Sequence, residues 1–228
     1  MLKIFMIFLT GTIVNSIKLI KPRNFLSYKN IRPIYDDLYN INKEHNFYSL
    51  EHIIPQSVFK KDNTTLKKDM HNIILYPNKL NTHRSNYKFT PNPNIYPTSK
   101  ILSEDGIPLI YDKKIEFDYS VKTNKFRTFY PHDKYKGLIA RSSMYFLMTY
   151  PEYREKIFGE IIDPFTILNW HLQYPVCQFE INKNDIIEEI QKNSNIYVNY
   201  PKELIDHMEI LINEDLKIFK DYKYKKID

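Results

Sequence analysis

The sequence has 228 residues, a hydrophobic fraction of 43% and an aromatic fraction of 15%, with 19 Tyr and 14 Phe. This composition excludes a disordered chain of low hydrophobicity, and the length allows one domain with a substantial core. The formal net charge of +6 at pH 7 favours a polyanionic partner. Nucleic acid and an anionic membrane surface both meet that description, so charge alone does not choose between them.

The N-terminus carries one lysine and then an apolar run from Ile4 to Val14. This run is too short for a spanning helix, which needs about 20 residues, and has the proportions of a signal-peptide core. We therefore predict a signal peptide over residues 1–16 and a single domain over 17–228, in a secreted or periplasmic protein. A buried first helix or strand is the alternative. The lone Cys177 excludes an intramolecular disulfide, so a virus-associated or organelle-targeted protein stays open.

The first predicted elements lie in the N-terminal half. Residues 24–46 include Ile34, Leu38 and Ile41 at helical spacing. The stretch SLEHIIPQSVF, residues 49–59, reads as a strand that stops near its proline, which cannot donate to a sheet ladder. The stretch DMHNIILYPNKLNTHRSN, residues 69–86, then predicts a turn, an apolar strand and a short helix.

The second half is expected to be mainly helical. Residues 90–100 are rich in proline and predict a surface loop, and residues 107–121 predict a hairpin because apolar side chains alternate there. Helices are expected over residues 133–150, over 164–195 with a break at Pro175, and over 201–223. Strands early and helices late place the fold in the α+β class.

A dense group of polar, ligand-capable side chains lies within the predicted strand, strand, helix segment. Glu51 offers a carboxylate oxygen and Asn81 an amide oxygen, which suit Mg²⁺ or Ca²⁺. A histidine such as His52 takes a proton from water at neutral pH better than either of those groups. An imidazole beside a divalent cation suits attack on a phosphodiester. The group comprises Glu51, His52, Asp69, His71, Asn72, Asn81, His83, Arg84 and Asn86.

Five blocks in order resemble the endonuclease I family of periplasmic and secreted nucleases, within the ββα-metal (His-Me finger) superfamily. The blocks are LEHIIPQSVF, DMHNIILYPNKLNTHRSNYKF, YKGLIARSSMYFLMTYP, LNWHLQYPVCQFEINKNDIIEEIQ and NYPKELI. The first two, with the WHLQYPVCQFE segment, are specific in combination. The resemblance implies a ββα-metal core with a small mixed sheet and flanking helices. It also implies cleavage of DNA, and often RNA, with little sequence preference, leaving 5′-phosphates.

Site roles follow from the resemblance by motif. It implies that His52 is the general base and that Glu51 and Asn81 hold the metal, with Mg²⁺ expected and Ca²⁺ or Mn²⁺ as alternatives. Arg84 and Asn86 match the Arg-Ser-Asn end of the second block. Contacts to nucleic acid are expected from a set of four residues: His71, Arg84, Asn86 and Arg141.

Departures from the family leave other readings open. Some relatives have disulfides and a phosphate-stabilising arginine where this chain has none, and only the lysines at positions 60, 61, 67 and 68 are candidates for the role of that arginine. A non-catalytic nucleic-acid-binding relative is the main alternative. A membrane-surface protein anchored by residues 1–16 is a third class, and a zinc site built from His52, His71 and His83 lacks any recognised ligand spacing. We expect a monomer that leaves the membrane once the signal peptide is removed.

Overall fold

The structure is a computed structural model that describes residues 20–41, 47–59, 64–91, 100–103, 108–109, 119–124 and 126–214. The predicted signal peptide and most of the predicted proline-rich loop lie outside these ranges. Within them, no helix is both long and apolar enough to cross a bilayer.

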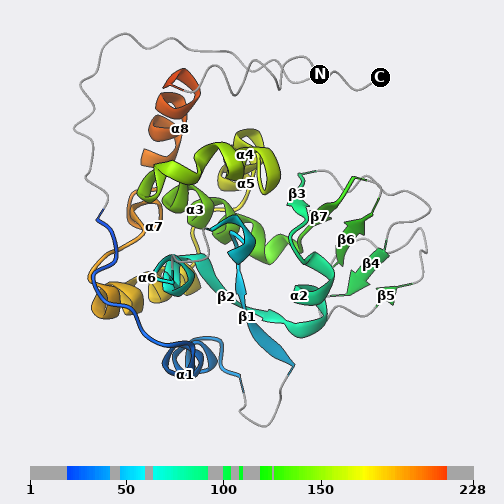
Figure 1. The fold of residues 1–228 in the computed structure, drawn as a ribbon, viewed down its shortest axis with the longest axis horizontal. Coiled ribbons are helices and arrows are strands. Elements are labelled where there is room, and N and C mark those ends of the chain that lie inside the picture. The colour runs from blue at the N-terminus through cyan, green and yellow to red at the C-terminus, as the bar shows by residue number, and fades with distance from the viewer. Residues whose placement is uncertain are drawn as a thin grey trace.

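The architecture is α+β, as predicted, with a strand hairpin at the junction of a helical part and a small sheet (Figure 1). The α-helices of the described residues are α1 Tyr28–Leu38, α2 Asn78–Arg84, α3 Asp133–Thr149, α4 Arg154–Glu160, α5 Pro164–Gln173, α6 Gln178–Gln191, α7 Ile196–Asn199 and α8 Glu203–Glu214. The strands are β1 Tyr48–His52, β2 Ile73–Pro77, β3 Lys88–Phe89, β4 Lys100–Ser103, β5 Pro108–Leu109, β6 Tyr119–Thr123 and β7 Thr128–Tyr130. Short 3₁₀ helices are η1 Gln56–Val58, η2 Leu66–Lys68, η3 Met70–Asn72 and η4 Pro151–Tyr153.

Strands β1 and β2 form an antiparallel hairpin, and α2 follows directly and contacts both strands. This is the strand, strand, helix order that the sequence predicts. Strand β2 is buried along its whole length because it separates two hydrophobic clusters. Ile74 and Tyr76 face the main core under α3, whereas Ile73 and Leu75 face a smaller cluster beneath α1 and α6. A strand covered on both faces explains the unbroken apolar run in the sequence.

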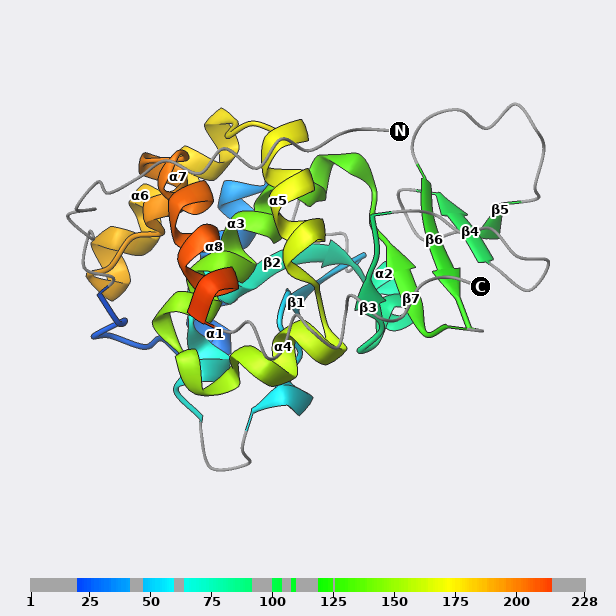
Figure 2. The same cartoon turned by 90° about the horizontal axis from the view of Figure 1, so that it is seen from above.

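The second sheet has the strand order β3-β7-β6-β4-β5 and lies on the far side of α2 from the hairpin (Figure 2). Helix α2 also contacts β6, so it joins the two sheets. The hairpin predicted over residues 107–121 is wrong for the described strands, since β4 lies between β5 and β6. Periodicity identified strand-like residues there and could not identify their partner, because β4 comes earlier in the chain.

The helical part is built around α3, which contacts α5 and α7. Helix α3 ends at Thr149, two residues before Pro151, which was predicted to stop it. The predicted break at Pro175 is confirmed, since α5 ends at Gln173 and α6 begins at Gln178. Helix α8 begins at Glu203, two residues after the proline expected to open it. Helices α4 and α7 are too short to show a clear period in the sequence.

Candidate active site

Glu51 and His52 are the last two residues of β1, and neighbouring strand side chains point to opposite faces. Glu51 lies opposite Ile74 and faces α2, whereas His52 lies opposite Ile73 and faces α1. Because the strand ends at His52, both side chains still reach one open cleft of about 410 Å³. Its lining is Leu50, Glu51, His52, Pro55, Gln56, Ser57, Arg84, Ser85 and Asn86.

The chain turns sharply after β1, and two side chains hold the turn. Asn72 accepts from the amide of Ile54 at 2.7 Å and donates to its carbonyl at 3.0 Å. Arg84 donates to the carbonyl of His52 at 2.8 Å and to that of Ile53 at 2.6 Å. Both holding side chains are buried, so these polar groups satisfy one another in place of water.

The imidazole of His52 has a defined proton arrangement. Its Nε2 lies 2.7 Å from the carbonyl oxygen of Lys67, an atom that can only accept a hydrogen bond. Nε2 therefore carries the proton, and Nδ1 keeps a lone pair that can accept one. The amide nitrogen of Gln56 lies 3.3 Å from Nδ1, which identifies the direction in which the basic nitrogen points.

Tyr28 of α1 supports the same ring. Its hydroxyl donates to the Lys67 carbonyl at 2.7 Å and lies 3.2 Å from Nε2 of His52. The two rings meet edge to face, with centroids 5.9 Å apart. Burial lowers the pKa of His52, partly opposed by the hydrogen bond to Lys67, and the charges of Arg84 and Lys67 lower it further. The ring is thus neutral, and available as a base, at physiological pH.

Glu51 pairs with Arg84 from the end of α2. Arg84 Nη1 lies 2.7 Å from Oε1 of Glu51, and the Arg84 side chain is only 2% exposed. Burial raises the pKa of Glu51, and the guanidinium opposes that shift. One hydrogen bond from Arg84 leaves the carboxylate further lone pairs for a cation, because a carboxylate has about four acceptor positions.

Asn81 lies one helical turn before Arg84, so both side chains are on one face of α2. Its amide nitrogen donates to the hydroxyl of Ser49 at 2.9 Å. Ser49 and Glu51 share a face of β1, so Asn81 and Arg84 face the same side of the strand. Glu51 carries a carboxylate oxygen and Asn81 an amide oxygen, the donor types that suit a hard divalent cation. Asn81 itself does not line the cleft.

Ser85 and Asn86 line the cleft just after α2. Ser85 has φ 52° and ψ −124°, a conformation that side-chain-bearing residues rarely adopt, and its amide donates to the Asn81 carbonyl at 3.0 Å. Such strain persists only where the surrounding structure holds it, and it is concentrated at functional sites. Asn86 is exposed, and its expected contact with nucleic acid stays a prediction.

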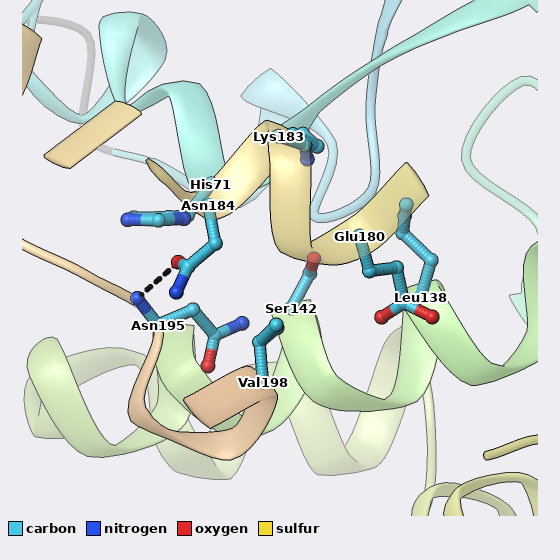
Figure 3. Close-up of a pocket in the computed structure, with 8 residues that line it drawn as sticks. All are labelled: His71, Leu138, Ser142, Glu180, Lys183, Asn184, Asn195 and Val198. Atoms are coloured by element: carbon cyan, nitrogen blue, oxygen red, sulfur yellow. Dashed lines mark hydrogen bonds between the residues drawn. The ribbon is translucent and has the colours of Figure 1, made fainter. Parts of the chain in front are cut away.

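Three of the four expected nucleic-acid contacts do not fit the structure. His71 is 2% exposed, and Arg84 and Arg141 are each 1% exposed, so none of these side chains is available to phosphate. Arg141 joins α3 to α6 through Glu180, with Nε 2.7 Å from Oε2. His71 lines a buried cavity of about 10 Å³ between α3, α6 and α7 (Figure 3), where Asn184 accepts from the Asn195 amide at 2.7 Å. That volume holds one water at most.

Sequence reasoning missed several residues that support His52. Tyr28 and Lys67 contact the ring from segments outside the strand, and Lys67 does so through its backbone, which carries no side-chain signature. Asn72 was recognised as part of the polar group without a role. Of the four lysine candidates for a phosphate contact, residues 60 and 61 lie outside the described ranges. Lys67 and Lys68 lie in η2.

A strand hairpin followed by a helix, with a histidine at the end of the first strand, an acidic neighbour and an asparagine on the helix, defines a ββα-metal core. A family model described as Endonuclease I matches residues 17–202, most of the chain. The chain therefore belongs to the endonuclease I family. Membership of this family indicates that the protein is broadly a nuclease and that its substrate is nucleic acid. The family is metal-dependent in general.

Proposed function

We propose that this protein is a metal-dependent endonuclease that hydrolyses phosphodiester bonds of DNA, with RNA as an alternative substrate, with little sequence preference and leaves 5′-phosphates. One observation carries the proposal: the Lys67 carbonyl accepts a hydrogen bond from Nε2 of His52, so the basic nitrogen is Nδ1, which lies 3.3 Å from Gln56 in the lining of the cleft that Glu51 shares. A second support is the family membership.

In this proposal His52 removes a proton from the attacking water through Nδ1. The amide nitrogen of Gln56 lies 3.3 Å from that nitrogen, so the attacking water would take the place of this contact. Glu51 and Asn81 would hold Mg²⁺, with Ca²⁺ or Mn²⁺ as alternatives, and the cation would supply stabilisation of the negative phosphate. Arg84 holds the carboxylate of Glu51 and the backbone that carries His52. It thereby keeps the positions of these two residues fixed relative to each other.

The proposal extends to the setting in which the enzyme works. The family is typically extracellular or periplasmic, and a cleaved signal peptide over residues 1–16 would place this chain there as a monomer. Reliance on phosphate contacts, which carry no sequence information, accounts for low sequence preference.

A plasmid-nicking assay tests the function. Wild-type protein with Mg²⁺ should convert supercoiled plasmid to nicked and linear forms, and excess chelator should stop the reaction. His52→Ala should lower the rate by roughly 10²- to 10⁴-fold, the usual contribution of a general base. Fragments should ligate without prior phosphorylation if they carry 5′-phosphates.

Folding and DNA binding of His52→Ala should match the wild type, because the ring lies at the end of a strand held by Arg84 and Asn72. Wild-type nicking rates in this variant would rule out the assignment. Tight DNA binding by the wild type without any Mg²⁺-dependent nicking would instead favour a non-catalytic binding protein.

A further inference from the structure

A group of cations gathers around Tyr87 where the five-stranded sheet meets α2. We call it the Tyr87 cluster, and it consists of His83, Tyr87, Lys100, Lys122 and Arg127. Lys100 and Arg127 are exposed, and the other three are partly exposed. None of these residues has a role in the proposed chemistry at Glu51 and His52.

The strand register places two like charges together. Lys100 of β4 and Lys122 of β6 are direct cross-strand partners, so both side chains lie on the same face of the sheet. Like charges in directly opposite positions destabilise a sheet. His83 of α2 is close enough to feel both lysines: burial lowers its pKa most, and Lys100 and Lys122 lower it further. The positive charge of the two sheet lysines therefore extends to α2.

Tyr87 holds two of the cations in fixed positions. Lys122 Nζ lies 4.5 Å from the ring centroid, and the guanidinium carbon of Arg127 lies 5.3 Å from it. The tyrosine hydroxyl donates to Oδ1 of Asn124 at 3.1 Å, which anchors the ring at its other end. A ring that already carries two cations serves to orient charge, and it is poorly placed to stack against a base.

Arg127 connects the Tyr87 cluster to the active-site cleft. It has φ 52°, a left-handed conformation that costs energy for a residue with a side chain. In that conformation its Nη2 donates to Oδ1 of Asn86 at 3.1 Å, and Asn86 lines the cleft beside Glu51 and His52. The cations and the cleft thus form one continuous surface.

The positive charge of the Tyr87 cluster is not neutralised within the described part of the chain. The ion pairs there involve other cations: Arg32, Arg84, Lys136, Arg141 and His207. The repulsive lysine pair reduces stability, and a ligand of opposite charge would offset that cost. A polyanion that also occupies the cleft meets this need.

We propose that the Tyr87 cluster binds backbone phosphates of the nucleic-acid substrate on one side of the scissile phosphate, a subsite that rests on the proposed nuclease function. Lys100 and Lys122 would contact adjacent phosphates, and Arg127 would connect that contact to the cleft through Asn86. Because the contacts go to phosphates and the Tyr87 ring is occupied, the subsite adds affinity and position without sequence preference.

The test compares two double variants for binding to a duplex DNA of mixed sequence, both in a His52→Ala background so that cleavage during the measurement is small. Lys100→Gln with Lys122→Gln should weaken binding roughly tenfold at about 100 mM salt and reduce the slope of log affinity against log salt by about 2. Lys192→Gln with Lys202→Gln removes two exposed lysines of the helical part and should leave both values unchanged.

Thermal unfolding of the same proteins separates binding from folding. Removal of the lysine repulsion should leave Tm unchanged or raise it, and Arg127→Gly should weaken DNA binding while Tm does not fall. Equal affinity in the two double variants, or weaker binding that comes with a lower Tm, would overturn the proposal. These binding measurements do not depend on cleavage, so the nicking assay can fail or succeed independently.

Discussion

Two buried histidines near the same hairpin illustrate how surroundings decide the role of one residue type. Burial lowers the pKa of both His52 and His71, and each ring lies within hydrogen-bonding distance of a backbone carbonyl. His52 lines an open cleft with one nitrogen fixed as a donor and the other directed at Gln56. His71 lies over the ring of Tyr145, with centroids 4.5 Å apart, and faces only a water-sized cavity. Only the first has access to a substrate.

His71 should make the protein sensitive to acid. Burial lowers its pKa from 6.5 to about 3, so between these values the unfolded chain binds a proton that the folded protein does not. The stability should therefore fall as pH decreases from 6.5 towards 3, by up to about 1.4 kcal/mol per pH unit. Denaturant unfolding from pH 6.5 to pH 4 should show a shallower decline in His71→Gln than in the wild type.

The difference between the two slopes of stability against pH, in the wild type and in His71→Gln, separates the contribution of His71 from that of neighbouring groups. Burial raises the pKa of Asp69 from 3.8 to about 6, so its contribution runs the other way, with stability falling as pH rises between those values. That contribution is present in both proteins and cancels in the difference. Parallel stability profiles for wild type and variant would show that His71 takes up its proton equally in both states.

At the scale of elements, the packing of α3 depends on a glycine. A Cβ at Gly137 would lie 2.5 Å from the carbonyl oxygen of Tyr174, after the end of α5, and would also clash with the Arg141 guanidinium. The obstacle is partly backbone and the guanidinium is held by Glu180, so neither can move cheaply. Gly137→Ala should therefore lower the free energy of unfolding by about 1 to 3 kcal/mol in urea denaturation.

Gly159 of α4 provides a matched control, since nothing lies within 4 Å of a Cβ built there. Gly159→Ala replaces a helical glycine without a clash and should raise stability by roughly 0.5 to 1 kcal/mol. Opposite signs for the two alanines would tie the loss at Gly137 to close approach of α3 and the segment after α5. A loss of similar size at both positions would contradict that explanation.

The hairpin shows what a sequence can and cannot predict at this scale. Apolar residues and a proline were enough to predict β1, β2 and α2 and to place Glu51 and His52 at a strand end. The support of His52 by the Lys67 carbonyl and by Tyr28 could not be predicted, because a backbone group and a distant helix leave no local pattern. The same reason explains why Arg141 was expected at phosphate: its burial depends on α6, which begins 37 positions later in the sequence.

At the scale of the whole molecule, the candidate active site lies where three parts of the fold meet. The hairpin is covered by α1 and α6 on one side, by the main core under α3 on the other, and α2 continues from it to the five-stranded sheet. His52 is supported through α1, Glu51 through α2, and the Tyr87 cluster through the sheet. Anything that binds Glu51 and Asn81 together therefore connects the hairpin to the helix that holds the sheet.

Metal binding should for this reason stabilise the entire fold. A ligand that binds only the folded state at 100 times its dissociation constant adds about 2.7 kcal/mol, which for a chain of this size raises Tm by about 5 to 10 °C. We expect such a rise with Mg²⁺, or with Ca²⁺ if Mg²⁺ binds weakly, and its reversal by chelator. Calorimetry or circular dichroism on metal-free protein would measure it.

The identity of the ligands decides which variants lose the effect. Glu51→Gln should abolish the metal-induced rise relative to its own metal-free Tm, and Asn81→Ala should reduce it. Glu188→Gln removes an exposed carboxylate of α6 and should retain the full rise. If Glu51→Gln shows the wild-type rise, the stabilising cation binds elsewhere. The role of Glu51 would then be limited to its ion pair with Arg84.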